Sequence, residues 1–168
     1  LMQTLEQVIA NLDALPEAKF KQIVETTNKA RKAFGIEKWI PNVGPQADAY
    51  RSEADVLLYG GAAGGGKTQL TLGLAVNEHQ RSIIFRREVS QTDGLEADGK
   101  AIIGNSATFN GQNSEWTWQH GKSLKLAGMK EPDDWGKHAG RERDLMGCDE
   151  AGEFLKHQVS ALMAWLRG

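Results

Sequence analysis

The sequence predicts an α/β fold in which a mostly parallel sheet carries a glycine-rich loop between a strand and a helix. The apolar run Val56–Tyr59 indicates the strand, and the loop Gly61–Thr68 follows it almost at once. Gln69–Val76 then shows helical spacing of its apolar residues. A second short apolar run, Leu145–Cys148, ends in two adjacent carboxylates. Strands that alternate with helices in this way are typical of parallel sheets.

Length and composition are those of a globular protein with one core. The 168 residues are 40% hydrophobic and 25% charged with a net charge of −2, so no overall basic character points to nucleic acid. The single cysteine, Cys148, excludes an internal disulfide and a multi-cysteine zinc site. No apolar run approaches the ~18 residues of a membrane span. We therefore expect a cytoplasmic setting and no membrane partner.

Residues 1–35 are predicted to form a helical N-terminal segment, ahead of an α/β domain in residues 36–168. Apolar residues from Leu5 to Leu15 follow helical spacing, and Pro16 ends that run. A second helix is expected to follow Pro16 and to end at Gly35.

Several further elements are expected in the α/β domain. A short helical turn in Ala47–Ser52 precedes the first strand, and Ser82–Phe85 is a short buried strand. Residues 93–111 are rich in Gly, Asn and Ala and predict a weak helix at best. Alternating residues on both sides of His120-Gly121 predict a β-hairpin. Phe154–Leu166 is expected to be an amphipathic helix.

The glycine-rich loop fits the phosphate-binding pattern G-x-x-x-x-G-K-[ST] without substitution. Its residues are Gly61, Ala62, Ala63, Gly64, Gly65, Gly66, Lys67 and Thr68. Glycines let such a loop turn tightly, so that its amides and the start of the next helix face phosphate oxygens. Lys67 is expected to contact the β- and γ-phosphates, and the Thr68 hydroxyl to ligate Mg²⁺. The alternative is a merely flexible glycine-rich loop.

Gln46 is a candidate contact to the nucleotide base, about fifteen residues ahead of the loop. Its side-chain amide can both donate to and accept from the edge of an adenine. Taken alone, a glutamine in such a position is more often an exposed loop residue.

The second motif is the apolar run Leu145–Cys148 with Asp149 and Glu150 at its end, a Walker B pattern. Parallel strands bring such carboxylates to the sheet edge at which the phosphate loop also opens. Asp149 is expected to hold Mg²⁺, directly or through water, and Glu150 to orient the attacking water. Alone, the pattern would fit a surface turn. Together with the loop it predicts Mg²⁺-dependent ATP hydrolysis and a P-loop NTPase core of the ASCE type.

Phosphoryl transfer also needs positive charge at the γ-phosphate. Arg86 and Arg87 follow the strand Ser82–Phe85 and are candidates to face the phosphates. Arg141 and Arg143 precede the Walker B strand, at the opposite end, where they are candidates to face a neighbouring subunit. Surface ion pairs with nearby acidic residues are the alternative for each arginine.

These residues resemble the large terminase subunit of tailed bacteriophages, from about Trp39 to Leu166. The similar stretches are Trp39–Pro41, Gly44–Gln46, Glu53–Thr68, Ile84–Glu88 and Gly140–Ala151. The resemblance implies a packaging ATPase that drives double-stranded DNA into a procapsid. It implies an adenine contact for Gln46, phosphate contacts for Gly61 to Thr68, and metal and water roles for Asp149 and Glu150.

The resemblance also implies binding partners and an incomplete ATPase domain. Expected partners are other terminase subunits in a ring, the portal and the small terminase subunit, in the host cytoplasm. In this family a coupling motif and a nuclease domain lie further along the chain, and this sequence ends at Gly168 before both. We therefore expect residues 36–168 to be a partial ATPase domain that is incomplete at its C-terminus and weak in hydrolysis alone.

Two other interpretations of the motifs remain. One is another P-loop ATPase that moves on DNA, of the helicase or recombination type. The other is a nucleotide-binding module that does not turn ATP over.

Overall fold

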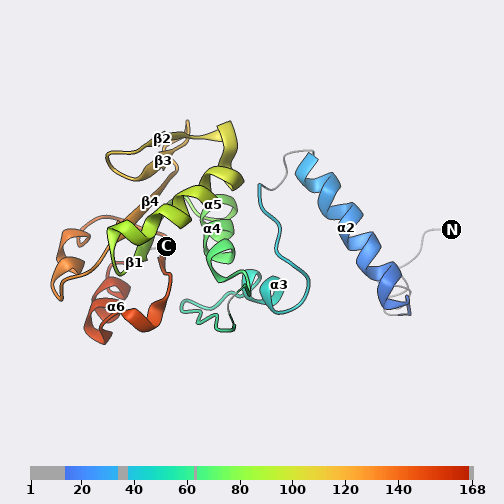
Figure 1. Ribbon diagram of the computed structural model, residues 1–168, viewed down its shortest axis with the longest axis horizontal. Helices are drawn as coiled ribbons and strands as arrows, with labels where there is room; N and C mark the ends of the chain where they lie inside the picture. The colour runs from blue at the N-terminus through green and yellow to red at the C-terminus, as the bar shows by residue number, and fades with distance from the viewer. Residues whose placement is uncertain (1–13, 34–37, 63, 167–168) are drawn as a thin grey trace. The chain divides into compact units, whose positions relative to one another are not determined.

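The computed structural model describes residues 14–33, 38–62 and 64–166 (Figure 1). The chain divides into two compact units, Leu1–Ile40 and Pro41–Gly168. In the first unit, helix α2 (Glu17–Ala33) follows Pro16, whose carbonyl accepts the amides two and three residues into the helix. The second predicted helix is thus confirmed, whereas the helix predicted before Pro16 and the end at Gly35 lie outside the described residues.

The second unit is α/β, built on an open five-stranded sheet within its described residues. The strand order is β2-β3-β4-β1-β5. The central strand β1 pairs in parallel with β4 and with β5, whereas β2–β3 and β3–β4 pair antiparallel. The strands are β1 (Arg81–Arg86), β2 (Thr108–Asn110), β3 (Glu115–Thr117), β4 (Ser123–Gly128) and β5 (Leu145–Cys148). The sheet is therefore mixed, and the prediction of a mostly parallel sheet is wrong.

The mixed sheet arises from the hairpin, which the sequence did predict. Strands β3 and β4 pair with Trp116 opposite Leu124. The turn between them places Gly121 at φ 79°, a conformation that glycine adopts at little cost. The other edge of β4 pairs with β1, so the hairpin continues the central sheet instead of lying apart from it.

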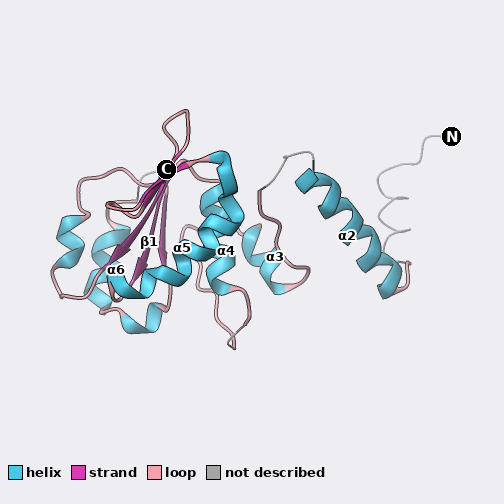
Figure 2. Ribbon diagram, turned by 45° about the horizontal axis from the view of Figure 1, so that its top comes forward, coloured by secondary structure: helices cyan, strands magenta, loops and turns pink. Residues whose placement is uncertain are grey.

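Helices cover both faces of this sheet (Figure 2). Helices α4 (Lys67–Asn77) and α5 (Asp93–Ile103) pack on one face and α6 (Lys156–Met163) on the other, whereas α3 (Pro45–Tyr50) packs against α4. Short 3-10 turns lie at Val89–Thr92, Gly104–Ser106, Asp134–Lys137 and Ala151–Glu153. None of the described helices is both long and apolar enough to cross a membrane.

The alternation of β1 divides the core into two clusters, because successive strand residues point to opposite faces. Ile84 faces one cluster, in which α4 contributes Leu72 and α5 contributes Leu95. Ile83 and Phe85 face the other cluster, to which α6 contributes a leucine. The first cluster anchors α4 against the sheet, and this packing fixes where the helix begins.

The strand predicted for Val56–Tyr59 does not form. These residues lie in irregular backbone, and Val56, Leu57 and Leu58 are 60%, 43% and 85% exposed. A strand needs a neighbour to pair with. On the side of β5 away from β1, the described residues supply only an isolated bridge between Arg143 and Leu166. The apolar composition of Val56–Tyr59 predicted a strand, but among the described residues no strand pairs with it.

The weak helix expected in residues 93–111 is instead a regular helix, α5, of 11 residues, followed by the short strand β2. Its buried residues Leu95, Gly99 and Ile103 recur every four positions and face the sheet. Gly99 lies directly over the ring of Trp116. The glycine that lowers local helix propensity therefore makes room for a tertiary contact that stabilises the helix.

Replacing Gly99 by alanine should destabilise the protein. An added Cβ would lie 2.7 Å and 2.9 Å from Cη2 and Cζ2 of the buried Trp116. We expect Gly99→Ala to lower the free energy of unfolding by about 1–3 kcal/mol, the usual cost of overpacking. Urea denaturation measures this free energy. The control is Gly94→Ala on the same helix, because no atom beyond the adjacent helix backbone and chain neighbours lies within 4 Å of a Cβ added at Gly94. Equal stability of the two variants would contradict the packing argument.

Candidate functional site

The glycine-rich loop runs directly into α4, whose first residue is Lys67. Gly64 and Gly66 have φ of 82° and 70°, in the left-handed region that other residues rarely adopt. Gly66 is the residue that precedes the helix, so the chain turns sharply at the point where the helix starts. The first amides of a helix have no partner within it and carry its positive dipole end. Ala63, predicted as part of the loop, lies outside the described residues.

The side chain of Lys67 folds back onto the loop. Its Nζ donates to the carbonyl oxygens of Gly61 at 2.9 Å and of Ala62 at 3.2 Å. The amide of Gly65 also donates to the Ala62 carbonyl, at 3.3 Å. The ammonium thus stands within the loop, where phosphate oxygens would compete with backbone carbonyls for its protons.

Thr68 and Asp149 are brought together although 81 residues separate them. The Thr68 Oγ1 lies 3.0 Å from Oδ2 and 3.2 Å from Oδ1 of the carboxylate. Thr68 is in the first turn of α4, and Asp149 comes directly after β5. The Asp149 amide donates to the Phe85 carbonyl at 3.0 Å, which extends the pairing of β5 with β1 by one residue. Sheet pairing and helix packing therefore position both side chains.

Arg86, the last residue of β1, binds the same carboxylate. Its Nε lies 2.9 Å and one terminal nitrogen 2.7 Å from Oδ2 of Asp149. The Asp149 side chain is 3% exposed and that of Arg86 is 22% exposed. A buried carboxylate is costly unless it is paired and hydrogen-bonded, and here both conditions are met. Arg86 thus has a specific partner that the sequence did not indicate, and its predicted contact with the phosphates stays a prediction.

Glu150 follows Asp149 in a left-handed conformation, with φ 57° and ψ 53°. It is exposed, and it precedes the 3-10 turn Ala151–Glu153. A non-glycine residue in this region is strained by roughly 1–2 kcal/mol. Strained residues gather at functional sites, so the outlier is consistent with a role for the Glu150 carboxylate.

Gln46 is buried, not exposed, and its amide is engaged by the backbone. Oε1 accepts the Asn42 amide at 2.7 Å, and Nε2 donates to the Gly66 carbonyl at 2.9 Å. A Cβ on Gly66 would lie 2.3 Å from Nε2 and would displace the Gln46 amide, and the φ of 70° would strain any other residue there. Gln46 therefore ties α3 to the base of the phosphate loop. The predicted adenine contact stays a prediction, and no sequence signal indicated this link.

The other three candidate arginines differ from Arg86: Arg141 and Arg143 precede β5, at the opposite end from Asp149, and Arg87 has another partner. Arg141 is exposed before the N-terminal end of β5, whereas Asp149 follows its C-terminal end. Arg143 is buried and donates to the Ser82 carbonyl at 3.4 Å, and burial lowers the pKa of its guanidinium. Arg87 donates to the Glu153 carbonyl at 3.2 Å.

The oxygen donors of Thr68 and Asp149 fit Mg²⁺. This ion takes one or two protein carboxylates or hydroxyls, with phosphate and water oxygens completing its octahedron. Within residues 14–33, 38–62 and 64–166, no group of three His, Cys, Asp or Glu forms a site that would hold a metal by side chains alone.

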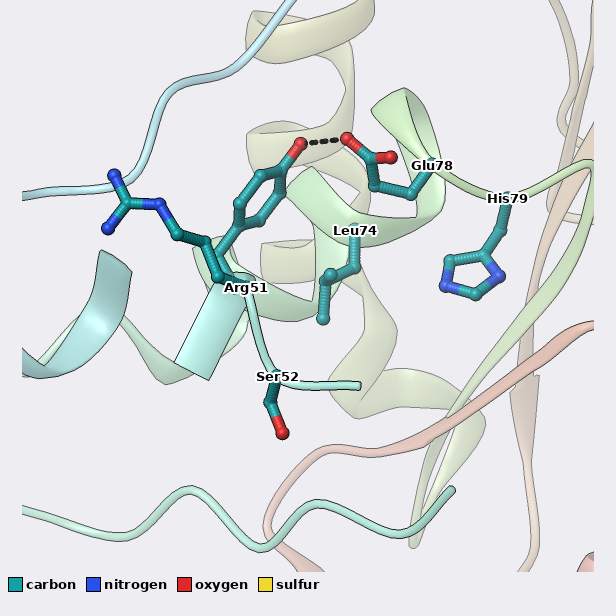
Figure 3. Close-up of a pocket in the computed structure, with 6 residues that line it drawn as sticks. Arg51, Ser52, Leu74, Glu78 and His79 are labelled. Atoms are coloured by element: carbon teal, nitrogen blue, oxygen red, sulfur yellow. Dashed lines mark hydrogen bonds between the residues drawn. The ribbon is translucent and has the colours of Figure 1, made fainter. Parts of the chain in front are cut away.

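A cavity of about 370 Å³ lies at the other end of α4 (Figure 3). Tyr50 and Glu78 contact each other across it through hydroxyl and carboxylate, and Asn77 donates to the same hydroxyl at 3.0 Å. Lys67 and Glu78 flank opposite ends of this helix, roughly 15 Å apart along its axis. The cavity is therefore separate from the phosphate loop.

The strain at Glu150 predicts an unusual gain in stability. Replacement of Glu150 by glycine should raise the free energy of unfolding by about 1 kcal/mol, because glycine adopts positive φ freely. The matched control is Glu153→Gly, at the end of the following 3-10 turn, where glycine should cost ~0.5–1 kcal/mol. Thermal unfolding of both variants measures the two changes in stability. A loss of stability in Glu150→Gly would contradict the strain.

Cys148 should be unreactive in the folded chain. Burial raises the pKa of its thiol from 9.0 to about 11, so the thiolate fraction at pH 8 falls roughly a hundredfold. We expect iodoacetamide to alkylate the native protein at least about a hundredfold more slowly than the urea-unfolded chain at the same pH. Similar rates in the two states would show that Cys148 is accessible and ionised.

Comparisons of this chain with protein-family models, with curated proteins and with solved structures found no match.

Proposed function

We propose that this chain binds ATP with Mg²⁺ at the loop Gly61–Thr68 and hydrolyses it. The observation that carries the proposal is the contact of Thr68 with the Asp149 carboxylate, at 3.0 Å and 3.2 Å. A phosphate-loop hydroxyl and a Walker B aspartate share one Mg²⁺ in P-loop NTPases. Here the two residues come from separate motifs, and they meet at the C-terminal edge of a parallel strand pair.

Each residue of the site has a role in this proposal. Loop amides and Lys67 bind the phosphates, with Lys67 exchanging its two carbonyl partners for phosphate oxygens. Thr68 and Asp149 hold Mg²⁺, which neutralises charge on the phosphates when bound. Glu150, exposed directly beside Asp149, positions and polarises the attacking water.

The finer proposal is that the ATPase is the motor of a viral terminase that packages double-stranded DNA. Its support is the resemblance of the stretches around Gln46, the loop, Arg86 and Asp149 described above. Within it, the exposed Arg141 is a candidate to act on the site of a neighbouring subunit in a ring. A helicase or recombination ATPase would share the site and differ in separating DNA strands.

A second candidate function, nucleotide binding without turnover, is favoured by one specific observation. Val56–Tyr59, which leads into the phosphate loop, is not paired in the sheet. The loop is therefore fixed by α4 and by Gln46 but not by a strand in front of it. Because catalysis requires phosphates held to within fractions of an ångström, a loosely held loop favours binding over hydrolysis.

Two substitutions test the proposal in different ways. Lys67→Ala should weaken binding of fluorescent mant-ATP by roughly 10- to 100-fold, since it removes a charged hydrogen-bond donor. Glu150→Gln should leave that affinity within about twofold and lower single-turnover hydrolysis by roughly 10²–10⁴-fold. Lys100→Ala, on the outer face of α5, is the control for loss of a lysine.

The outcomes separate the candidate functions. If Glu150→Gln hydrolyses ATP as fast as the unaltered chain, the catalytic assignment of Glu150 fails. If the unaltered chain binds mant-ATP without any turnover, the binding module is the better description. If Lys67→Ala binds as well as Lys100→Ala, the loop is not the nucleotide site.

A further inference from the structure

We infer that Arg86 is the resident cation of Asp149, and that Mg²⁺-nucleotide binds only by displacing it. Arg86 would then set the Mg²⁺ concentration at which the site loads. This inference rests on the proposed function, because it concerns the regulation of that same site. Its starting point is the pair itself: one guanidinium directs two nitrogens, at 2.9 Å and 2.7 Å, at a single oxygen of a buried carboxylate.

The oxygen that Arg86 holds is also the one nearest to Thr68. Thr68 Oγ1 lies 3.0 Å from Oδ2, and the guanidinium contacts the same Oδ2. An Mg²⁺ ion bound by Thr68 and Asp149 needs oxygens at about 2.0–2.1 Å in near-octahedral order. Two cations on one carboxylate oxygen in a site of 3% exposure repel each other strongly, since water screens them little. We therefore expect an Mg²⁺ ion at Oδ2 and the Arg86 contact with that oxygen to exclude each other.

The exchange requires movement of a side chain, not of the fold. The backbone of Arg86 is held in β1, paired with Gly128 of β4. The Arg86 side chain is 22% exposed, whereas that of Asp149 is 3% exposed. The Asp149 backbone is fixed by its amide bond to Phe85. The metal-loaded and metal-free states thus differ in the rotamer of Arg86.

Neighbouring cations are engaged elsewhere. Lys67 donates to the carbonyls of Gly61 and Ala62, and Arg87 donates to that of Glu153. Arg87 is therefore the matched control. It carries the same guanidinium group one position along the chain, but its partner is the Glu153 carbonyl instead of Asp149.

The test is the Mg²⁺ dependence of mant-ADP binding, followed by fluorescence at fixed nucleotide concentration. Arg86→Gln removes the competing cation, so its Mg²⁺ midpoint should fall by roughly fivefold or more. Arg87→Gln should leave the midpoint unchanged. Arg86→Lys keeps the charge and should stay closer to the unaltered chain than Arg86→Gln does. An unchanged or higher midpoint in Arg86→Gln, or Mg²⁺-independent binding by the unaltered chain, would overturn the inference.

A second measurement needs no folded Arg86→Gln variant. The Nε–H resonance of Arg86 in ¹⁵N-labelled protein, assigned by its loss in Arg86→Lys, should stay in place with ADP alone. It should move when Mg²⁺ is added with ADP, because its bond to Asp149 breaks. A resonance that does not respond to Mg²⁺-ADP would overturn the inference. Absence of mant-ADP binding by the unaltered chain would instead contradict the proposed function.

Discussion

The buried carboxylate of Asp149 is the point at which the sheet, the phosphate loop and the site depend on one another. A carboxylate of 3% exposure is tolerated only with full partners, and these come from different elements: Thr68 from α4 and Arg86 from β1. The contacts require β1 beside β5 and the start of α4 at the C-terminal edge of both strands. Loss of either partner would leave a buried charge incompletely paired.

Other polar side chains of the site also have partners within the protein. Lys67 is bound to loop carbonyls, Gln46 to Asn42 and Gly66, and Arg86 to Asp149. A nucleotide that binds here would therefore have to exchange at least the contacts of Lys67 and Arg86 for its own. The affinity for nucleotide would then depend on the difference between the hydrogen bonds of the free protein and those of the nucleotide-bound protein. Because Mg²⁺ would complete the bound set, the affinity should depend on Mg²⁺.

Much of the site could be predicted from the sequence, because its two motifs are local patterns. The phosphate loop, α4 and the four residues of β5 follow from spacing and apolar runs of adjacent residues. Pairing could not be predicted in the same way. The alternating residues predicted the hairpin, but they did not predict that β4 also pairs with β1. Val56–Tyr59 has the composition of a strand but does not pair with one. Nor does the sequence show that Gln46 and Arg86 bind Gly66 and Asp149, since both links join residues far apart in the chain.

The backbone at the two motifs adds an argument that composition alone cannot supply. Gly66 and Glu150 both turn with positive φ where the chain leaves the loop and β5. At Gly66 the positive φ favours glycine, and an added Cβ, 2.3 Å from the amide of Gln46, would displace that side chain. At Glu150 the same kind of turn carries an exposed carboxylate in a strained conformation, although glycine would fit the backbone better. The strained residue thus directly follows the proposed metal ligand Asp149, and its strain supports the role proposed for the Glu150 carboxylate.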